Sequence, residues 1–146
     1  MIRILFVCLG NICRSPMAEF VMKQMVAEKG LADQFEIASA ATEGYNEMVH
    51  EALDYRKADM LRQMKVPYTQ HYSRQIRKSD YDKFDYILAM DDNNVRDILD
   101  IVGGTRTTRF IACWTSPKIL VRLRILGTPV ILMRPIGIFM KVARHF

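Results

Sequence analysis

The sequence predicts an α/β protein, built as a three-layer, doubly wound parallel sheet of about four strands. Over the first hundred residues, short and nearly continuous apolar runs alternate with longer stretches whose apolar residues recur at helical spacing. Continuous apolar runs fit strands that are buried on both faces of a sheet, and their alternation with helices indicates parallel βαβ units. The chain has 146 residues, half of them apolar, which is enough to bury one core. We expect residues 1–146 to form a single domain.

The first strand and the first helix are predicted from strong local signals. Residues 2–7, Ile-Arg-Ile-Leu-Phe-Val, form a run rich in β-branched and aromatic side chains, which predicts a buried strand. A helix is predicted over about 16–29, because Ser15 is a good N-cap, Pro16 suits the first helical position and Gly30 suits the position after the helix. The residues between these two elements therefore form a loop at a helix N-terminus, where α/β folds bind anions.

The following elements repeat this alternation. In chain order, the pattern predicts a strand at 35–40, a loop at 43–46, a helical region from about 49 to 64 that Pro67 ends, a short turn capped at 79–80, a buried strand at 84–90 and a strand at 109–113. Asp91 is a good N-cap for a further helix that ends near Leu99, with Gly103 and Gly104 behind it.

Residues 101–146 differ in composition from the rest of the chain. They contain eight of the 21 Lys and Arg residues and none of the 16 Asp and Glu residues. Beyond residue 113 the apolar runs are interrupted by arginine, proline and glycine, and no amphipathic closing helix is predicted. We therefore treat residues 105–146 as an atypical part of the domain.

Several classes of protein are excluded by composition. Cys8, Cys13 and Cys113 are an odd number of cysteines, two of them in one short loop, which argues against a disulfide framework and for a reducing compartment. No uncharged apolar run reaches the 18 or so residues of a membrane span, and the basic tail lacks the segregation of a membrane-surface helix and the aromatic interleaving of a nucleic-acid patch. His50 and His145 have no partners at metal spacing. We expect no membrane, nucleic acid or metal.

The loop before the first helix carries the chemistry of the chain. A cysteine and an arginine bracket five residues in it, and a serine follows them. In order, its members are Cys8, Leu9, Gly10, Asn11, Ile12, Cys13, Arg14 and Ser15. Gly10 allows a positive φ or a close approach of the backbone to a ligand, and Asn11 tolerates left-handed geometry better than other side chains. This spacing lets the loop wrap around one tetrahedral anion.

Cys8 and Arg14 together indicate a nucleophile inside an anion site. Successive backbone N–H groups, the helix N-terminus and the guanidinium of Arg14 each favour the thiolate form of Cys8. The planar fork of Arg14 can hold two oxygens of a phosphate at once. The implied reaction is an in-line attack of the Cys8 sulfur on a phosphate monoester, giving a cysteinyl-phosphate that water later hydrolyses.

Residues 7–19 read Val-Cys-Leu-Gly-Asn-Ile-Cys-Arg-Ser-Pro-Met-Ala-Glu. This sequence strongly resembles the loop motif of the low-molecular-weight protein tyrosine phosphatases. Shorter motifs that resemble the same family follow in order at 39–42 (Ser-Ala-Ala-Thr), 54–56 (Asp-Tyr-Arg), 71–75 (His-Tyr-Ser-Arg-Gln) and 85–91 (Asp-Tyr-Ile-Leu-Ala-Met-Asp). The resemblance covers roughly residues 1–104. It implies a cytoplasmic phosphatase without cofactor or metal, which acts on phosphotyrosine in proteins or peptides and binds inorganic phosphate or a similar oxyanion.

The resemblance also implies roles for the loop residues. Cys8 is the expected nucleophile and Arg14 the expected phosphate ligand. Asn11 and Ser15 are expected to hold the loop and the thiolate in place.

The same resemblance implies roles for residues that are not expected to contact the phosphate. His71 is expected to be a structural histidine bonded behind the loop, with Ser39 as a further supporting residue. Tyr45 matches the aromatic wall of the substrate cleft. Cys13 is expected to form a reversible disulfide with Cys8 under oxidation, which protects Cys8 from further oxidation.

Ile12 bears on the choice of substrate. Relatives that act on phosphoarginine carry a threonine just before the second cysteine, so Ile12 favours phosphotyrosine.

Arsenate reductases of related fold are an alternative, but they need further cysteines for electron transfer, and Cys13 and Cys113 do not obviously supply that relay. A catalytically weak phosphate- or phosphotyrosine-binding module is the other alternative.

One part of the family pattern is absent from this chain. The family's general acid is an aspartate in an Asp-Pro-aromatic motif in the last third, and no general acid is found here. Asp100 is the last acidic residue, and the three later prolines follow Ser116, Thr128 and Arg134. Residues 105–146 are either encoded in a shifted reading frame, which we favour, or divergent. In both cases we expect impaired catalysis.

Overall fold

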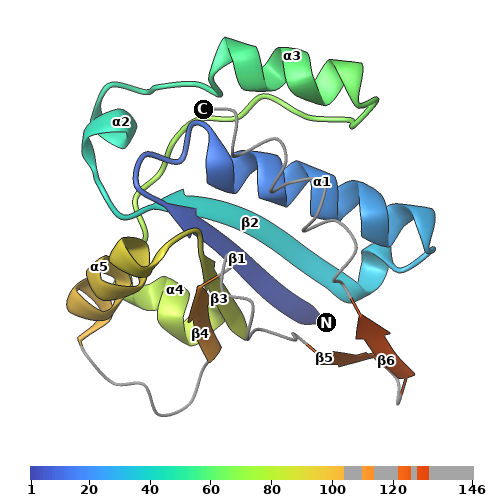
Figure 1. Ribbon diagram of the computed structural model, residues 1–146. Helices are drawn as coiled ribbons and strands as arrows, with labels where there is room; N and C mark the ends of the chain where they lie inside the picture. Colours follow the sequence, from blue (N-terminus) through green and yellow to red (C-terminus); the bar gives the residue numbers. More distant parts are fainter. Residues whose placement is uncertain (104–109, 114–121, 126–127, 132–146) are drawn as a thin grey trace.

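Four apolar segments form one parallel sheet, in the order β2-β1-β3-β4 (Figure 1). The strands are β1 (Ile2–Cys8), β2 (Phe35–Ala41), β3 (Tyr86–Ala89) and β4 (Phe110–Cys113). The computed structural model describes the chain over 1–103, 110–113, 122–125 and 128–131, and its side chains over 1–103. The predicted doubly wound α/β fold is confirmed, including the four strands of the sheet.

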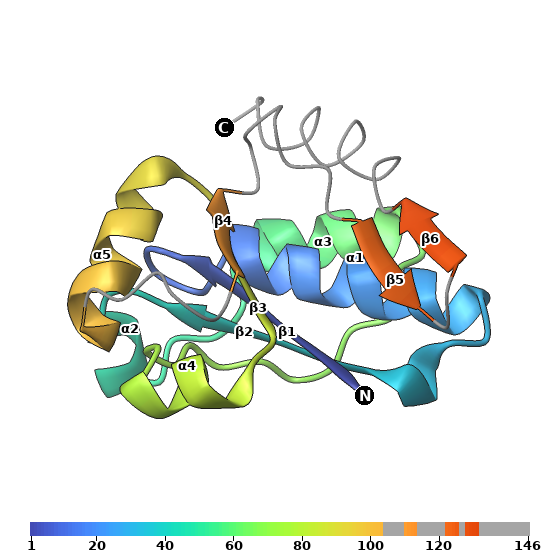
Figure 2. The same cartoon turned by 90° about the horizontal axis from the view of Figure 1, so that it is seen from below.

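Helices cover both faces of this sheet, which gives three layers. Helices α1 (Arg14–Glu28) and α3 (Tyr55–Gln63) lie on one face, and α4 (Lys78–Lys83) and α5 (Asp92–Val102) lie on the other (Figures 1 and 2). Two short helices, η1 (Ala32–Gln34) and α2 (Tyr45–Met48), flank β2 in the chain. Outside this sheet, β5 (Arg122–Ile125) and β6 (Thr128–Ile131) form an antiparallel pair.

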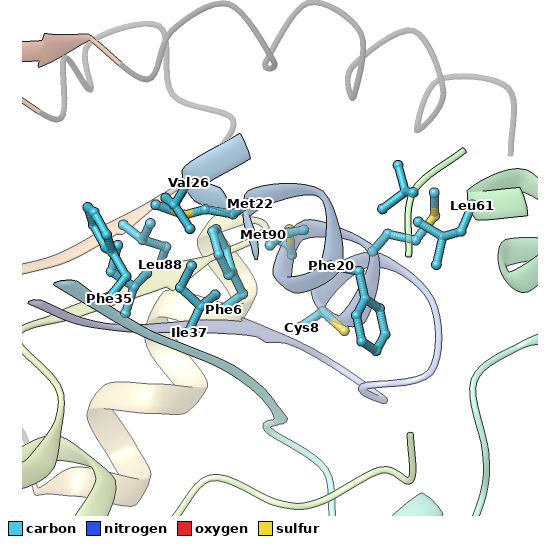
Figure 3. Packing of buried hydrophobic residues seen from close by; sticks show 14 residues of the cluster. Phe6, Cys8, Phe20, Met22, Val26, Phe35, Ile37, Leu61, Leu88 and Met90 are labelled. Atoms are coloured by element: carbon cyan, nitrogen blue, oxygen red, sulfur yellow. The ribbon is translucent and has the colours of Figure 1, made fainter. Parts of the chain in front are cut away.

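The central strand β1 contributes side chains to a separate hydrophobic core on each face of the sheet, because successive side chains of a strand point in opposite directions. Ile4, Phe6 and Cys8 pack into a cluster with residues of α1 and α3 (Figure 3). Leu5 and Val7 pack into the cluster under α4 and α5. A strand buried on both faces must be apolar at every position, which explains the continuous run.

The predicted helix ends at Gly30 and at Asp91 are confirmed. Gly30 has a φ of +67°, and the bonds Gly30 N–H to Ala27 O (2.9 Å) and Leu31 N–H to Val26 O (2.8 Å) form the paired ending typical of a glycine after a helix. The Asp91 carboxylate accepts from Asn94 N–H at 2.8 Å and so caps α5.

The predicted start of the first helix was wrong by two residues. The helix begins at Arg14, and Ser15, expected as its N-cap, lies inside the helix. Cys13 occupies the cap position without a side-chain bond to the helix. The Ser15 hydroxyl instead points back to the Cys8 sulfur, so its interaction with the loop replaces the cap that local sequence rules expect.

The helix predicted from about residue 49 was also wrong in its first part. α3 begins only at Tyr55, where the Asp54 carboxylate accepts from Arg56 N–H at 2.9 Å. Before it, His50 has a φ of +53° and Ala52 forms an isolated β-bridge with Tyr72, so this stretch is fixed by tertiary contacts rather than by helical spacing. The predicted loop at 43–46 contains the first half of α2.

The remaining boundaries differ by a few residues. β3 covers the centre of the predicted 84–90 strand, α5 continues three residues past Leu99 to a left-handed Gly103, and α4 is capped by Asp80, which accepts from Arg77 N–H at 2.8 Å. The strand predicted at 109–113 is confirmed as β4. Apart from the backbone of β4, β5 and β6, the predictions for residues 105–146 lie outside the described residues.

Candidate active site

The candidate site lies where the sheet changes its winding direction. β1 has β2 on one side and β3 on the other, so the loops that follow β1 and β3 leave the sheet on opposite faces. In doubly wound sheets, ligands bind in the crevice that this divergence opens at the carboxyl ends of the strands. Cys8 is the last residue of β1, and residues 9–13 lead directly into the N-terminus of α1.

The Cys8 sulfur is buried and faces two polar partners. Only 3% of Cys8 is exposed. The backbone N–H of Asn11 donates to its Sγ at 3.2 Å, and Ser15 Oγ lies 3.0 Å from it. Donors aimed at a sulfur stabilise its anion, and the helix N-terminus adds a positive field of the same sign. This environment suits a thiolate.

Asn11 is the central residue of the loop. It is fully buried and has a φ of +52°, as the sequence predicts for this position. Its side-chain Nδ2 donates to Ser15 Oγ and to Ser39 Oγ, both at 2.9 Å, and its Oδ1 accepts from Arg74 N–H at 3.1 Å. Its carbonyl oxygen accepts from His71 Nε2 at 2.9 Å. These four bonds hold a left-handed conformation that is costly for a residue with a Cβ.

The orientation of the Ser15 hydroxyl follows from Asn11. Since Ser15 Oγ accepts from Asn11 Nδ2, its own proton is free to point at the Cys8 sulfur at 3.0 Å or at Ala40 O at 3.3 Å. The shorter contact is to sulfur. Ser39 donates its proton to Glu19 Oε2 at 2.5 Å and is likewise left to accept from Asn11.

Gly10 has no positive φ, and its role is a close approach to the Asn46 side chain. Its carbonyl oxygen accepts from Asn46 Nδ2 at 3.0 Å and from Ser73 Oγ at 2.9 Å. A Cβ at this position would lie 2.6 Å from Asn46 Nδ2, closer than real side chains come. The glycine therefore lets α2 contact the loop.

Arg14 makes an ion pair across the crevice. Its Nη1 donates to Asp91 Oδ2 at 2.7 Å, and the other oxygen of Asp91 caps α5. Burial opposes ionisation of Asp91, but the hydrogen bonds from Arg14 and from Asn94 N–H outweigh it and lower the pKa of Asp91 below its usual range. Arg14 has five N–H donors, so the fork formed by Nε and Nη2 is left for an anion.

Both cysteines of the loop are free thiols. Burial, together with the negative charge of Asp54, raises the pKa of Cys13 above its ordinary value. The two cysteines are therefore in different environments, with the donors directed at Cys8.

Among the described residues, no group of three His, Cys, Asp or Glu side chains could hold a metal ion, and no described helix is long and apolar enough to cross a membrane.

Most of the predicted site residues are brought together, and several contacts were missed. Tyr45 stands at the start of α2, next to Asn46, and its side chain is exposed, as is that of Leu9. The carbonyl oxygen of Ile12 accepts from Asp54 N–H at 2.9 Å. The sequence reasoning missed Glu19, Asn46, Ser73, Arg74 and the second role of Asp91. Glu19, Ser73, Arg74 and Asp91 all lie within the family-like motifs, which was the available signal; Asn46 lies outside them and had none.

Comparison with known proteins gives a consistent picture. The family model described as low molecular weight phosphotyrosine protein phosphatase matches residues 3–116. A protein of that description from Homo sapiens is 44% identical over 95 residues, which are 65% of this chain and 58% of the human protein. The aligned part of the chain therefore spans less than two thirds of this curated relative.

Two solved structures are also similar. The crystal structure of YfkJ from Bacillus subtilis matches with a TM-score of 0.74 and 29% identity, covering 99% of this chain and 93% of that one. The crystal structure of DARP, a Drosophila arginine phosphatase, matches with a TM-score of 0.68 and 33% identity, covering 76% of this chain and 69% of that one. Both support the same fold.

Proposed function

The chain belongs to the low molecular weight phosphotyrosine protein phosphatase family, and we propose that it hydrolyses phosphotyrosine monoesters through a cysteinyl-phosphate on Cys8. The observation that supports this most directly is the buried Cys8 sulfur, which receives Asn11 N–H at 3.2 Å and Ser15 Oγ at 3.0 Å at the N-terminus of α1. The chemistry requires a thiolate nucleophile inside an anion-binding loop, and these contacts favour one.

In the first step, the Cys8 thiolate attacks phosphorus in line with the tyrosyl oxygen. The S–P bond forms as the P–O bond to tyrosine breaks, and the leaving oxygen takes a proton from water. In the second step, water attacks phosphorus, the S–P bond breaks and inorganic phosphate is released with the thiolate restored. Arg14 and the backbone N–H groups of the loop stabilise the charge on the equatorial oxygens in both steps.

The sequence contains no acid for the leaving group after Asp100, and the carboxylates that lie beside the loop are poor substitutes. The side-chain hydrogen bond from Arg56 lowers the pKa of Asp54, and Arg14 helps to lower that of Asp91. Both are held ionised, whereas a general acid has to be protonated at working pH. We therefore propose slow turnover for this chain, with a phosphotyrosine-binding module of weak activity as the second candidate.

Phosphotyrosine is the proposed substrate in preference to phosphoarginine, although one similar structure is an arginine phosphatase. Ile12 stands where the family's phosphoarginine-directed members have threonine, and it offers no hydroxyl to a polar guanidinium. Inorganic phosphate or a similar oxyanion is expected to bind the same loop as a product. The odd number of cysteines, two of them in one short loop, supports a reducing, cytoplasmic location.

Cys13 is proposed as the redox partner of Cys8. An oxidised Cys8 sulfenic acid would be attacked by the Cys13 sulfur, forming the S–S bond and releasing water, and a thiol reductant would restore both thiols. The raised pKa of Cys13 keeps it a protonated thiol, so Cys13 does not compete with Cys8 for the phosphate.

The test is the replacement Cys8→Ser, with Cys13→Ser as the matched change in the same loop. Cys8→Ser is expected to lower turnover of p-nitrophenyl phosphate on the order of 10⁴-fold, because the nucleophile is gone. Inorganic phosphate binding, measured by calorimetry, should persist, since the N–H groups and Arg14 remain. Cys13→Ser should retain most of the turnover. If Cys8→Ser turned over at the rate of the unmodified chain, the nucleophile would be misassigned.

Rapid quench with a labelled substrate separates the two candidates. A burst of product followed by steady turnover supports the phosphatase. Accumulation of phosphorylated Cys8 with little further product supports the weak binding module, because the second step would then be the slow one.

A further inference from the structure

The backbone around Cys8 is held by its carbonyl oxygens. Each carbonyl from residue 8 to residue 12 accepts a hydrogen bond from a more distant part of the chain. In the order of these carbonyls, the donors are Thr42 N–H, Glu43 N–H, Ser73 Oγ together with Asn46 Nδ2, His71 Nε2 and Asp54 N–H. In a trans peptide the carbonyl and the N–H that follows it point in opposite directions. A donor that holds a carbonyl therefore also sets where the next N–H points.

The peptide between Gly10 and Asn11 is the one that faces the nucleophile. Its N–H donates to Cys8 Sγ at 3.2 Å. Its carbonyl oxygen accepts from Ser73 Oγ at 2.9 Å and from Asn46 Nδ2 at 3.0 Å. Two side-chain donors thus act on one end of a rigid planar unit whose other end is directed at the sulfur.

The local preference of the backbone opposes this orientation. Rotating the peptide plane by half a turn would change ψ of Gly10 and φ of Asn11 by about 180°. Gly10 tolerates the change because it has no Cβ. Asn11 would leave its φ of +52° for the negative range that residues with a side chain prefer. The carbonyl oxygen would then face the Cys8 sulfur and repel a thiolate or a phosphate. The bonds to the Gly10 oxygen oppose this rotation.

Ser73 is the better anchored of the two donors. It is 4% exposed, whereas Asn46 is half-buried and belongs to the four-residue α2. A hydrogen bond is stronger where water has less access to it. The backbone on either side of the Ser73 hydroxyl is also fixed, since Ser73 N–H donates to Glu51 O at 2.8 Å and Arg74 O accepts from Ala41 N–H at 2.7 Å. The hydroxyl therefore reaches Gly10 from a segment that cannot easily move away.

We propose that Ser73 is a positioning residue for the nucleophile. Its bond to the Gly10 oxygen, supported by Asn46, keeps the Asn11 N–H directed at the Cys8 sulfur and keeps the carbonyl away from the anion site. Ser73 acts through one peptide unit rather than on the reacting atoms. This inference rests on the proposed function, because the effect assigned to Ser73 is an effect on the Cys8 thiolate.

The experiment compares the full chain with Ser73→Ala, Asn46→Ala and the double variant. Each protein is alkylated with iodoacetamide over a range of pH, and fragment masses give the rate at Cys8 alone. The pH of half-maximal rate, the alkylation midpoint, should rise by about half a unit in Ser73→Ala, because a bond that orients a donor to the thiolate is lost. The rise should be smaller in Asn46→Ala. In the double variant it should exceed the sum of the two, because either bond alone still opposes the rotation.

Turnover of p-nitrophenyl phosphate gives the second readout. We expect kcat/KM to fall about threefold in Ser73→Ala and about tenfold or more in the double variant. Ser79→Ala removes an exposed serine of α4 and should change neither readout. The titratable groups near Cys8 and its loop are the same in all these proteins, so a shifted midpoint reports the peptide. These groups are Cys13, Arg14, Glu19, Asp54, His71 and Asp91.

The outcomes separate this inference from the function on which it rests. If the alkylation midpoint is the same in Ser73→Ala, in the double variant and in the unmodified chain, while Cys8→Ser still removes turnover, the positioning role is refuted and the phosphatase proposal stands. The positioning role is also refuted if kcat/KM falls without a change in the midpoint, because Ser73 would then act only through the stability of the fold. If the unmodified chain neither binds inorganic phosphate nor turns over p-nitrophenyl phosphate, both proposals fail together.

Discussion

At the scale of single residues, Asp91 has two tasks, and they can be separated by substitution. One oxygen caps α5 at Asn94 N–H and the other holds Arg14 at 2.7 Å. Asp91→Ser keeps a good helix cap but is too short to reach Arg14. We expect the unfolding midpoint to change little and phosphate binding to weaken about tenfold, because an unrestrained arginine must be ordered on binding at a cost of up to about 2 kcal/mol.

Asp91→Asn serves as the matched control for this prediction. It retains both the cap and an acceptor for Arg14, so it should recover part of the phosphate affinity, measured by calorimetry for all three proteins. Tighter phosphate binding in Asp91→Ser would contradict the prediction and show that Asp91 competes with the anion for Arg14.

The pH dependence of this pair follows from the direction of the Asp91 pKa. In the unfolded chain the pKa of Asp91 is that of an ordinary aspartate, about 3.9, and in the folded state it is lower. The ion pair with Arg14 therefore stabilises the fold in full above the unfolded-state pKa. It is lost as the pH falls through the lower, folded-state pKa. The Asp91 side chain is more than a third exposed, so solvent screens the pair and its contribution to stability is small.

At the scale of elements, the ends of α1 and α3 offer a matched pair of substitutions. Both helices end with the same two bonds, and the residue after the C-cap is Gly30 in α1 and Lys65 in α3, with φ of +67° and +55°. Gly30→Ala should destabilise by about 1 kcal/mol because alanine is strained at positive φ, although its Cβ meets open space. Lys65→Gly should stabilise by about 0.5 kcal/mol for the same reason. Urea unfolding measures both, and shifts of the same sign would contradict this account.

Sequence rules worked at element ends where the signal is local. Gly30 and Asp91 act on backbone groups within a few residues, so their roles are visible in the sequence. They failed at Ser15, a good cap whose hydroxyl is taken by the Cys8 sulfur. They failed again before Tyr55, where a bond from Asp54 N–H to Ile12 O ties the chain to the loop between β1 and α1. In both places a tertiary contact with the site overrides the local preference.

At the scale of the whole molecule, the sheet and the position of the Cys8 loop between β1 and α1 were predictable, but the contacts that support the loop were not. Continuous apolar runs identify buried strands, and the loop after the first strand carries its own motif. Asn11, however, is held by Ser39, His71 and Arg74, which lie 28, 60 and 63 residues away. Only the fold brings these segments together at the carboxyl edge of the sheet. For Ser39 and His71 the family resemblance supplied the expectation, whereas Arg74 lies in the family-like motif at 71–75 without a role having been expected for it.

The chain as a whole should therefore be limited by the leaving group. In the proposed mechanism the loop supplies attack and charge stabilisation, but no acidic residue follows Asp100, and Asp54 and Asp91 are held ionised by arginines. General acid catalysis contributes about 10²–10⁴-fold, and it matters most when the leaving oxygen is basic. Across a series of aryl phosphates, kcat/KM should fall steeply as the leaving phenol becomes more basic, and alkyl phosphates should react slowest. Steady-state rates with p-nitrophenyl, phenyl and alkyl phosphates test this. A flat dependence on the leaving group would mean that a proton donor acts in this protein after all, and would direct the search to the crevice between the loops that follow β1 and β3.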